Sequence, residues 1–213
     1  YPILTKNAYR TPAGDFRSHP VFIDQLNASV PDIDLLEFQL RHQYEHSIEI
    51  GLNVLSGIIS PKEINVIPIL AGSTATLSSH IKDDLDVNCD LNNFSRTLKS
   101  IASEHKTLVI AAADLCHVGP AFGGAPYEPA PDTVKEYDLD LLDLISNSDK
   151  TGFNNEVFST NNKNNICGTS SIYYLLDILE NIQGELIDYQ QCPADDFNQS
   201  LVSIAGMKFV AKE

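Results

Sequence analysis

Three side chains that could perform chemistry, Asp114, Cys116 and His117, follow an apolar, β-branched run at residues 107–110. A carboxylate, a thiol and an imidazole can bind a metal ion, move a proton or attack an electrophile. In an open α/β sheet, catalytic groups gather where strands end and loops begin. We therefore expect residues 111–119 to form part of a site.

Asp114 and His117 are three residues apart. His117 could be a ligand of a first-row metal or a general base, and Asp114 could orient the imidazole or accept a proton. A structural Asp–His hydrogen bond that closes the loop explains the same spacing. Cys116 alternates away from its neighbours, so we expect it in the core.

A further thiol, Cys167, precedes Gly168 and an apolar helical pattern over residues 172–179. The sequence thus places Cys167 at a helix N-terminus, where unpaired N–H groups and the helix dipole favour a thiolate. Such a thiol is suited to be a nucleophile or a metal ligand. The alternative is a small buried apolar side chain, which describes most free cysteines.

The third stretch contains Glu45, His46 and Glu49. If a helix begins near Glu45, then His46 and Glu49 project together from its first turns. A solvated acidic helix start explains this stretch when it is taken alone. Together, the three stretches offer the nitrogen, oxygen and sulfur donors of an iron, copper or zinc site.

The composition excludes several classes of function. The chain has 213 residues with 14 basic and 29 acidic side chains, a formal net charge of −15, which opposes binding to nucleic acid. No apolar run approaches the ~20 residues of a membrane-spanning helix. Four cysteines without a CxxC pair indicate a reducing compartment, and no signal-peptide pattern opens the chain. We expect a cytoplasmic protein.

Strand-type and helix-type segments alternate along the chain. This alternation predicts a single domain over residues 1–213, a three-layer α/β architecture with a mainly parallel or mixed sheet flanked by helices. A loop rich in Asn is expected over 147–165. The expected strands are 64–72, 108–114, 186–189 and 200–210, and the expected helical regions are 48–59, 80–104, 133–145 and 172–179.

The three stretches resemble, in order, signatures of the MEMO family, whose bacterial members are called AmmeMemoRadiSam system protein B. The resemblance extends from the segment Tyr9-Arg-Thr-Pro to the final expected strand. Its motifs are Glu45-His-Ser-Ile-Glu49, Ala113-Asp-Leu-Cys-His-Val-Gly119 with Phe122, and Asn165-Ile-Cys-Gly168.

The resemblance implies a fold related to the class III extradiol dioxygenases, with a non-haem metal site. It implies that Asp114, His117 and Cys167 line the site cleft. Cys167 stands in the position of the family's metal-binding cysteine, and His46 would sit alongside as a supporting residue.

The chain departs from the family pattern at its start. A Pro-His-Ala-Gly stretch and a Gly-x-x-His stretch, which supply two histidine ligands in the family, are absent from the sequence. We expect a MEMO-like domain that lacks its N-terminal portion. Three explanations stay open: the chain is a fragment, a second chain supplies the remainder, or this member has lost the site.

Together with these residues, the resemblance implies a redox-active, dioxygenase-like iron or copper centre acting on an unknown small-molecule substrate. In this hypothesis Cys167 and His117 bind the metal, His117 also serves as acid or base, Asp114 orients it, and His46 belongs to the catalytic set. The rival hypothesis is a non-catalytic interaction module whose cleft binds a peptide or a radical-SAM partner. A Cys–His hydrolase with Cys167 as nucleophile is a third option, without a recognised nucleophile elbow in the sequence.

Overall fold

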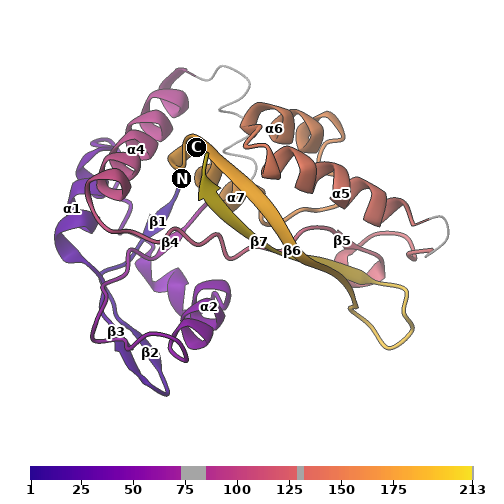
Figure 1. The fold of residues 1–213 in the computed structure, drawn as a ribbon, viewed down its shortest axis with the longest axis horizontal. Coiled ribbons are helices and arrows are strands. Elements are labelled where there is room, and N and C mark those ends of the chain that lie inside the picture. Colours follow the sequence, from indigo (N-terminus) through magenta and orange to yellow (C-terminus); the bar gives the residue numbers. More distant parts are fainter. Residues whose placement is uncertain (73–84, 129–131, 213) are drawn as a thin grey trace. The chain divides into compact units, whose positions relative to one another are not determined.

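A computed structural model describes residues 1–72, 85–128 and 132–212 (Figure 1). Within it the chain divides into two compact units, Tyr1–Ala112 and Ala113–Glu213. Each unit is described by itself below. The expectation of a single domain stays a prediction.

The first unit combines short strands with helices. Two pairs of strands are antiparallel, β1 with β4 and β2 with β3, and α1 packs against α4. The strands are β1 (Ile3–Leu4), β2 (Tyr9–Thr11), β3 (Gly14–Phe16) and β4 (Ile69–Leu70). The helices are α1 (Pro20–Ala28), α2 (Ser47–Leu55) and α4 (Leu85–Glu104), with a 3₁₀ helix η1 (Gln39–Gln43).

His42 lies in the last turn of η1 and is buried. The side chain is 7% exposed. Its Nδ1 lies 2.7 Å from the hydroxyl of Tyr9, and its Nε2 lies 3.0 Å from the carbonyl oxygen of Ile3. Burial lowers the pKa of His42. The imidazole therefore joins β1 to β2 through hydrogen bonds.

The second unit is built on a long antiparallel hairpin of β6 (Ile182–Pro193) and β7 (Leu201–Ala211), with the short β5 (His117–Val118) on the other edge of β7. Figure 1 shows this hairpin beside the helices of the unit. Helix α5 packs on β6 and α6, and α6 packs on α7. The helices are α5 (Thr133–Ser146), α6 (Lys150–Ser159) and α7 (Thr169–Ile178), with a 3₁₀ helix η2 (Pro120–Phe122).

The core of the second unit comes from the apolar faces of its helices. Burial of these side chains is the main favourable contribution to the stability of the unit. Fully or nearly fully buried members are Val134, Leu141, Leu142, Ile145, Phe153, Val157, Ile166, Ile172, Leu175 and Leu176.

The mixture of helices and strands agrees with an α/β class, but the strand pairing differs from the expected parallel or mixed sheet. Every ladder among the described residues is antiparallel, and the parallel pairing there is one isolated bridge, Ser18 with Val66. The run 108–114 forms no strand, and Leu108 and Ile110 are exposed. A β-branched run becomes a strand only against a partner backbone, and no described strand pairs with residues 108–114.

One expected helical region agrees with the structure where it is described, and one expected loop differs from it. The region 80–104 is helical from Leu85, and residues 80–84 lie outside the described part of the chain. The Asn-rich stretch 147–165 was expected as a loop, but it contains α6. Asp149 caps this helix by accepting a hydrogen bond from the Gly152 N–H at 2.8 Å, and Phe153 and Val157 are buried. Capping and burial together override the poor helix propensity of asparagine.

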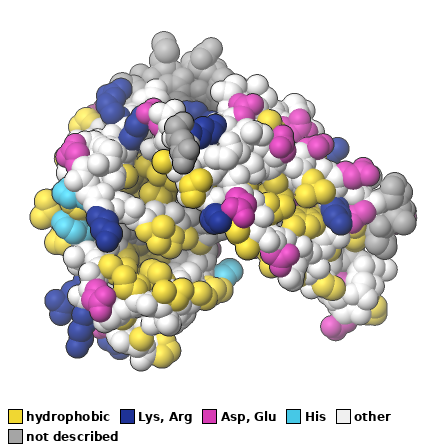
Figure 2. Space-filling model, viewed as in Figure 1, with side chains coloured by type: hydrophobic (Ala, Val, Ile, Leu, Met, Phe, Trp, Pro, Cys, Tyr) yellow, Lys and Arg dark blue, Asp and Glu magenta, His cyan; other side chains and the backbone are white. Residues whose placement is uncertain are grey.

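Two features bear on the partners of the protein. Within the described residues, no helix has both the length and the apolarity needed to cross a membrane. Figure 2 shows acidic side chains dispersed over the visible face rather than gathered in one tract. No single acidic tract is visible on this face.

Replacing Asp149 with alanine should reduce the free energy of unfolding by about 1 kcal/mol, because the α6 N-cap bond is lost. Urea unfolding monitored by circular dichroism measures the change. Asp140→Ala is the matched control, since Asp140 is exposed in the interior of α5 and its removal should change stability by less than about 0.5 kcal/mol. Equal losses in the two variants would contradict the capping role.

Candidate metal centre

The position of His117 is fixed by backbone hydrogen bonds between β5 and its neighbours. His117 pairs with Val202 in register. Just before it, the Leu115 N–H donates to the Ser203 carbonyl and the Ser203 N–H donates to the Cys116 carbonyl, both at 3.0 Å. The His117 N–H donates to the Asn164 carbonyl at 2.9 Å. The strand thus lies between β7 and the loop that leads to Cys167.

Gly119 ends β5 in a conformation that favours glycine. Its φ is +104°, and a Cβ at this position would lie 2.3 Å from the carbonyl oxygen of Gln199. No other residue fits there without moving the backbone. The turn therefore sends the chain away from β7 directly after His117 and Val118.

Cys167 is positioned by the loop before it and the helix after it. The Asn162 side chain accepts a hydrogen bond from the Ile166 N–H at 2.9 Å and donates to the Ile166 carbonyl at 3.3 Å. Ile166 is fully buried. Gly168 is the N-cap residue of α7, so the expected place of Cys167 at a helix N-terminus agrees with the structure.

Gly168 lets this segment approach the segment that carries Asp114. A Cβ on Gly168 would lie 2.5 Å from the Cβ of Ala113 and 2.6 Å from the carbonyl oxygen of Asp114. Such distances are far inside van der Waals contact. The absence of a side chain at Gly168 is therefore required for the close approach of the two segments.

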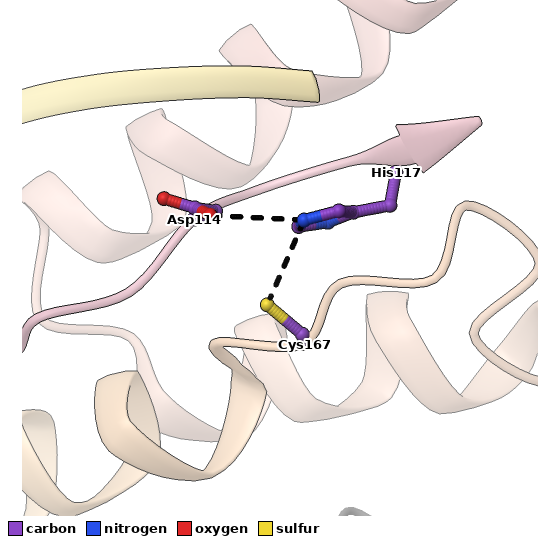
Figure 3. A group of neighbouring side chains, drawn as sticks. All are labelled: Asp114, His117 and Cys167. Atoms are coloured by element: carbon purple, nitrogen blue, oxygen red, sulfur yellow. Dashed lines mark hydrogen bonds and ion pairs between the residues drawn. The ribbon is translucent and has the colours of Figure 1, made fainter. Parts of the chain in front are cut away.

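Asp114, His117 and Cys167 meet as a group of three potential ligands (Figure 3). The Nε2 atom of His117 lies 3.7 Å from Asp114 Oδ2 and 4.0 Å from Cys167 Sγ. All three ligand atoms lie within 4.8 Å of one another. The His117 side chain is 13% exposed and that of Asp114 is 49% exposed, so the group opens to solvent on the carboxylate side.

The other ring nitrogen of His117 fixes its tautomer. Nδ1 lies 3.1 Å from the carbonyl oxygen of Leu115, which can only accept a hydrogen bond, so Nδ1 carries the proton. In the neutral form of His117, Nε2 then presents its lone pair toward Asp114 and Cys167. A neutral imidazole held in this way by a backbone carbonyl is the form in which histidine binds metal ions.

The spacing of the three donors fits a single metal ion. Metal bonds of about 2.0 Å to nitrogen and 2.3 Å to sulfur in tetrahedral geometry separate two donor atoms by about 3.5 Å. The observed 3.7 Å and 4.0 Å require small side-chain movements. Three protein donors leave at least one coordination position open, as in catalytic rather than structural sites.

Cys116 is a core residue, as the sequence predicted. It is fully buried, and its thiol donates to Asp138 Oδ1 at 2.9 Å. Asp138 is also fully buried and accepts a second bond from the hydroxyl of Tyr189 at 2.8 Å. Burial and the Asp138 carboxylate raise the pKa of the Cys116 thiol far above its usual value. Cys116 is therefore a poor nucleophile.

Sequence reasoning missed Asp138, Asn162 and the steric role of Gly168. Asp138 could have been found, because it occupies a core-facing position of the expected helix 133–145, where a carboxylate needs a partner. Asn162 and Gly168 gave no such signal. Their roles depend on a loop conformation that the spacing of apolar residues does not report.

His46 is in the other unit, where it is the N-cap residue of α2 without a side-chain capping bond. Glu45 accepts a hydrogen bond from Ser47, and Glu49 lies in the first turn of α2. This arrangement agrees with the expected acidic start of a helix. A place for His46 beside Asp114, His117 and Cys167 stays a prediction.

Comparison with known proteins identifies the family. A family model described as "Memo-like protein" matches residues 1–208. The chain therefore belongs to the Memo-like protein family.

Individual relatives are similar over most of this chain. A "MEMO1 family protein" of Aquifex aeolicus is 30% identical over 209 residues, which cover 94% of this chain and 49% of the relative. The "Protein memo-1 homolog" of Caenorhabditis elegans is 24% identical, covering 85% and 49%. A MEMO1 family protein of Pyrococcus horikoshii is 26% identical, covering 76% and 53%. The chain thus spans about half the length of these curated relatives.

Replacing Gly168 with alanine should destabilise the protein by about 1–3 kcal/mol, because the added methyl group overlaps Ala113 and Asp114. Gly51→Ala is the control, since a Cβ at this position of α2 meets nothing within 4 Å. This control should increase the free energy of unfolding by at most about 1 kcal/mol. Urea unfolding measures both. A Gly168→Ala variant as stable as the parent would refute the required close approach.

The two thiols near the candidate centre should differ in reactivity. Brief treatment with iodoacetamide at pH 7.5, followed by peptide mass spectrometry, should modify the exposed Cys167 and leave Cys116 unmodified, because Cys116 is buried and its pKa is raised. In urea, both should react. Modification of Cys116 in the folded protein at the rate of Cys167 would contradict the burial of its thiol.

Proposed function

We propose that this chain carries a mononuclear, non-haem iron or copper centre for oxidative chemistry on a small substrate, with a fold related to the class III extradiol dioxygenases. The observation that carries the proposal is the meeting of one carboxylate, one imidazole and one thiol around His117 Nε2. Iron, copper and zinc accept this mixed donor set, whereas magnesium and calcium prefer oxygen alone.

Each residue has a separate role in this proposal. Cys167 Sγ and His117 Nε2 hold the metal, and the N-terminus of α7 stabilises negative charge on the sulfur. Asp114 is exposed enough to reach solvent or a substrate, so it orients His117 and accepts a proton. His117 acts as acid or base when its Nε2 is not bound. The metal would supply the electron transfer that none of these side chains can perform.

The membership in the Memo-like family and the open coordination position support a reactive rather than a purely structural centre. The burial of Asp114, His117 and Cys167 is also suitable for a reactive centre, because His117 is nearly buried while Cys167 and Asp114 are exposed. A substrate can therefore approach without displacing the core.

Removing the sulfur tests the proposal. The protein and its Cys167→Ala variant are loaded with Fe²⁺ without oxygen, or with Cu²⁺, and their metal content is measured after desalting. Cys167→Ala should bind metal at least about tenfold more weakly, since even outer-shell changes at metal sites cost 10–100-fold. It should also lack the sulfur-to-copper charge-transfer absorption, and its metal-dependent oxygen uptake should fall with its metal content.

Cys192→Ala is the matched control, because Cys192 lies in β6 and outside the trio. This variant should keep the metal content of the parent. Equal metal content in the parent and Cys167→Ala would overturn the ligand assignment. Background metal content in the parent itself would favour an interaction module over a metal centre.

A further inference from the structure

A pocket of about 370 Å³ lies in the second unit, on the side of His117 formed by the turn after β5. Its lining combines residues of that turn with two residues of the loop before Cys167. The lining residues are His117, Val118, Gly119, Phe122, Gly123, Gly124, Ala125, Lys163 and Asn165. The size is at the lower end for ligand sites in proteins, which indicates a small ligand.

The charge of this pocket is opposite to that of the chain. Among the described residues that line it, Lys163 is the one with a permanent charge and none is a carboxylate, although the chain carries a net charge of −15. Lys163 is exposed, and no ion pair with it is found among the described residues. Its ammonium group is available to a ligand, and the amide of Asn165 adds hydrogen-bonding capacity beside it.

The backbone of the turn limits the charge of the ligand. The N–H groups of Phe122 and Gly124 donate to the Gly119 carbonyl at 3.0 Å, and that of Gly123 donates to the Pro120 carbonyl at 3.1 Å. Sites for phosphate usually offer several free N–H groups together with a cation. With these three N–H groups already used, one ammonium group matches a single negative charge.

The remaining lining suits a flat, apolar body. The Phe122 ring stands perpendicular to the His117 ring, with the centroids 5.0 Å apart. The glycines around it present backbone instead of side chains, and a Cβ on Gly123 would meet nothing within 4 Å. A planar group can therefore lie along Phe122 with little obstruction from the turn.

From these observations we infer that the pocket binds a small organic monocarboxylate with a planar or apolar body. Lys163 and Asn165 hold the carboxylate, and Phe122 contacts the body. The inference deepens the proposed function, on which it rests for its biological meaning, since His117 belongs to both the pocket and the metal trio. It names the class of substrate that would be presented to that centre.

Benzoate is a suitable probe, with benzamide as its neutral analogue of the same shape and inorganic phosphate as a second anion. Binding is measured by calorimetry on the metal-free chain, and NMR locates it through the amide signals of Gly123 and Gly124. Benzoate should bind at least about tenfold more tightly than benzamide, because the bond from Lys163 is charge-assisted. Phosphate should bind more weakly than benzoate.

Lys163→Gln should weaken benzoate binding about tenfold and leave the weak benzamide binding unchanged. Lys135→Gln is the matched control, because Lys135 is an exposed lysine of α5 outside the pocket, and it should bind benzoate like the parent. Equal benzoate binding by Lys163→Gln and the parent overturns the inference. Benzamide binding as tight as benzoate, or phosphate binding tighter than benzoate, also overturns it.

The metal content of Lys163→Gln after loading separates this inference from the proposed function. Lys163 does not belong to the group of Asp114, His117 and Cys167, so this variant should load metal like the parent. If benzoate binding depends on Lys163 but the chain takes up no metal, the anion pocket is retained and the metal centre is refuted. Normal metal uptake by a parent chain that does not bind benzoate would retain the metal centre and refute the anion pocket.

Discussion

The candidate centre depends on one steric constraint, the contact of Gly168 with the backbone of Ala113 and Asp114. A methyl group at Gly168 would overlap both residues, so hydrogen is the largest substituent that this junction accepts. The contact brings the segment that carries the sulfur against the segment that carries the carboxylate and the imidazole. All three donors come from segments without long regular structure, and this packing replaces the support that a continuous strand or helix would give.

The hydrogen-bonded group of Cys116, Asp138 and Tyr189 also holds the residues next to His117 in place. Asp138 is fully buried and is hydrogen-bonded both to Cys116, directly before β5, and to Tyr189 on β6. A buried carboxylate is stabilising only where its oxygen atoms have donors, and here each oxygen has one. The group therefore ties α5, β6 and the approach to β5 together, so that the residues next to His117 have little freedom to shift.

Much of the helical structure could be predicted from the sequence, and so could the three residues that meet in the candidate centre. The apolar spacing located α2, α5 and α7, and residue types alone marked Asp114, His117 and Cys167 as candidate ligands. The pairing of strands could not be predicted, because the β-branched run 108–114 reports the tendency to form a strand but not the presence of a partner. Helix α6 was missed since its signal is the cap at Asp149 and two buried side chains, not its composition.

Strand β5 consists of two residues, His117 and Val118. A shift of the strand by one residue would therefore place the imidazole on the opposite side of the sheet. Successive side chains of a strand point to opposite faces, so His117 and Val118 divide the two faces between them. With Gly119 confined to its turn by Gln199 and Leu115 bonded to Ser203, the number of residues between these two anchors is fixed. One inserted residue there would turn the imidazole to the opposite face, and two would restore it.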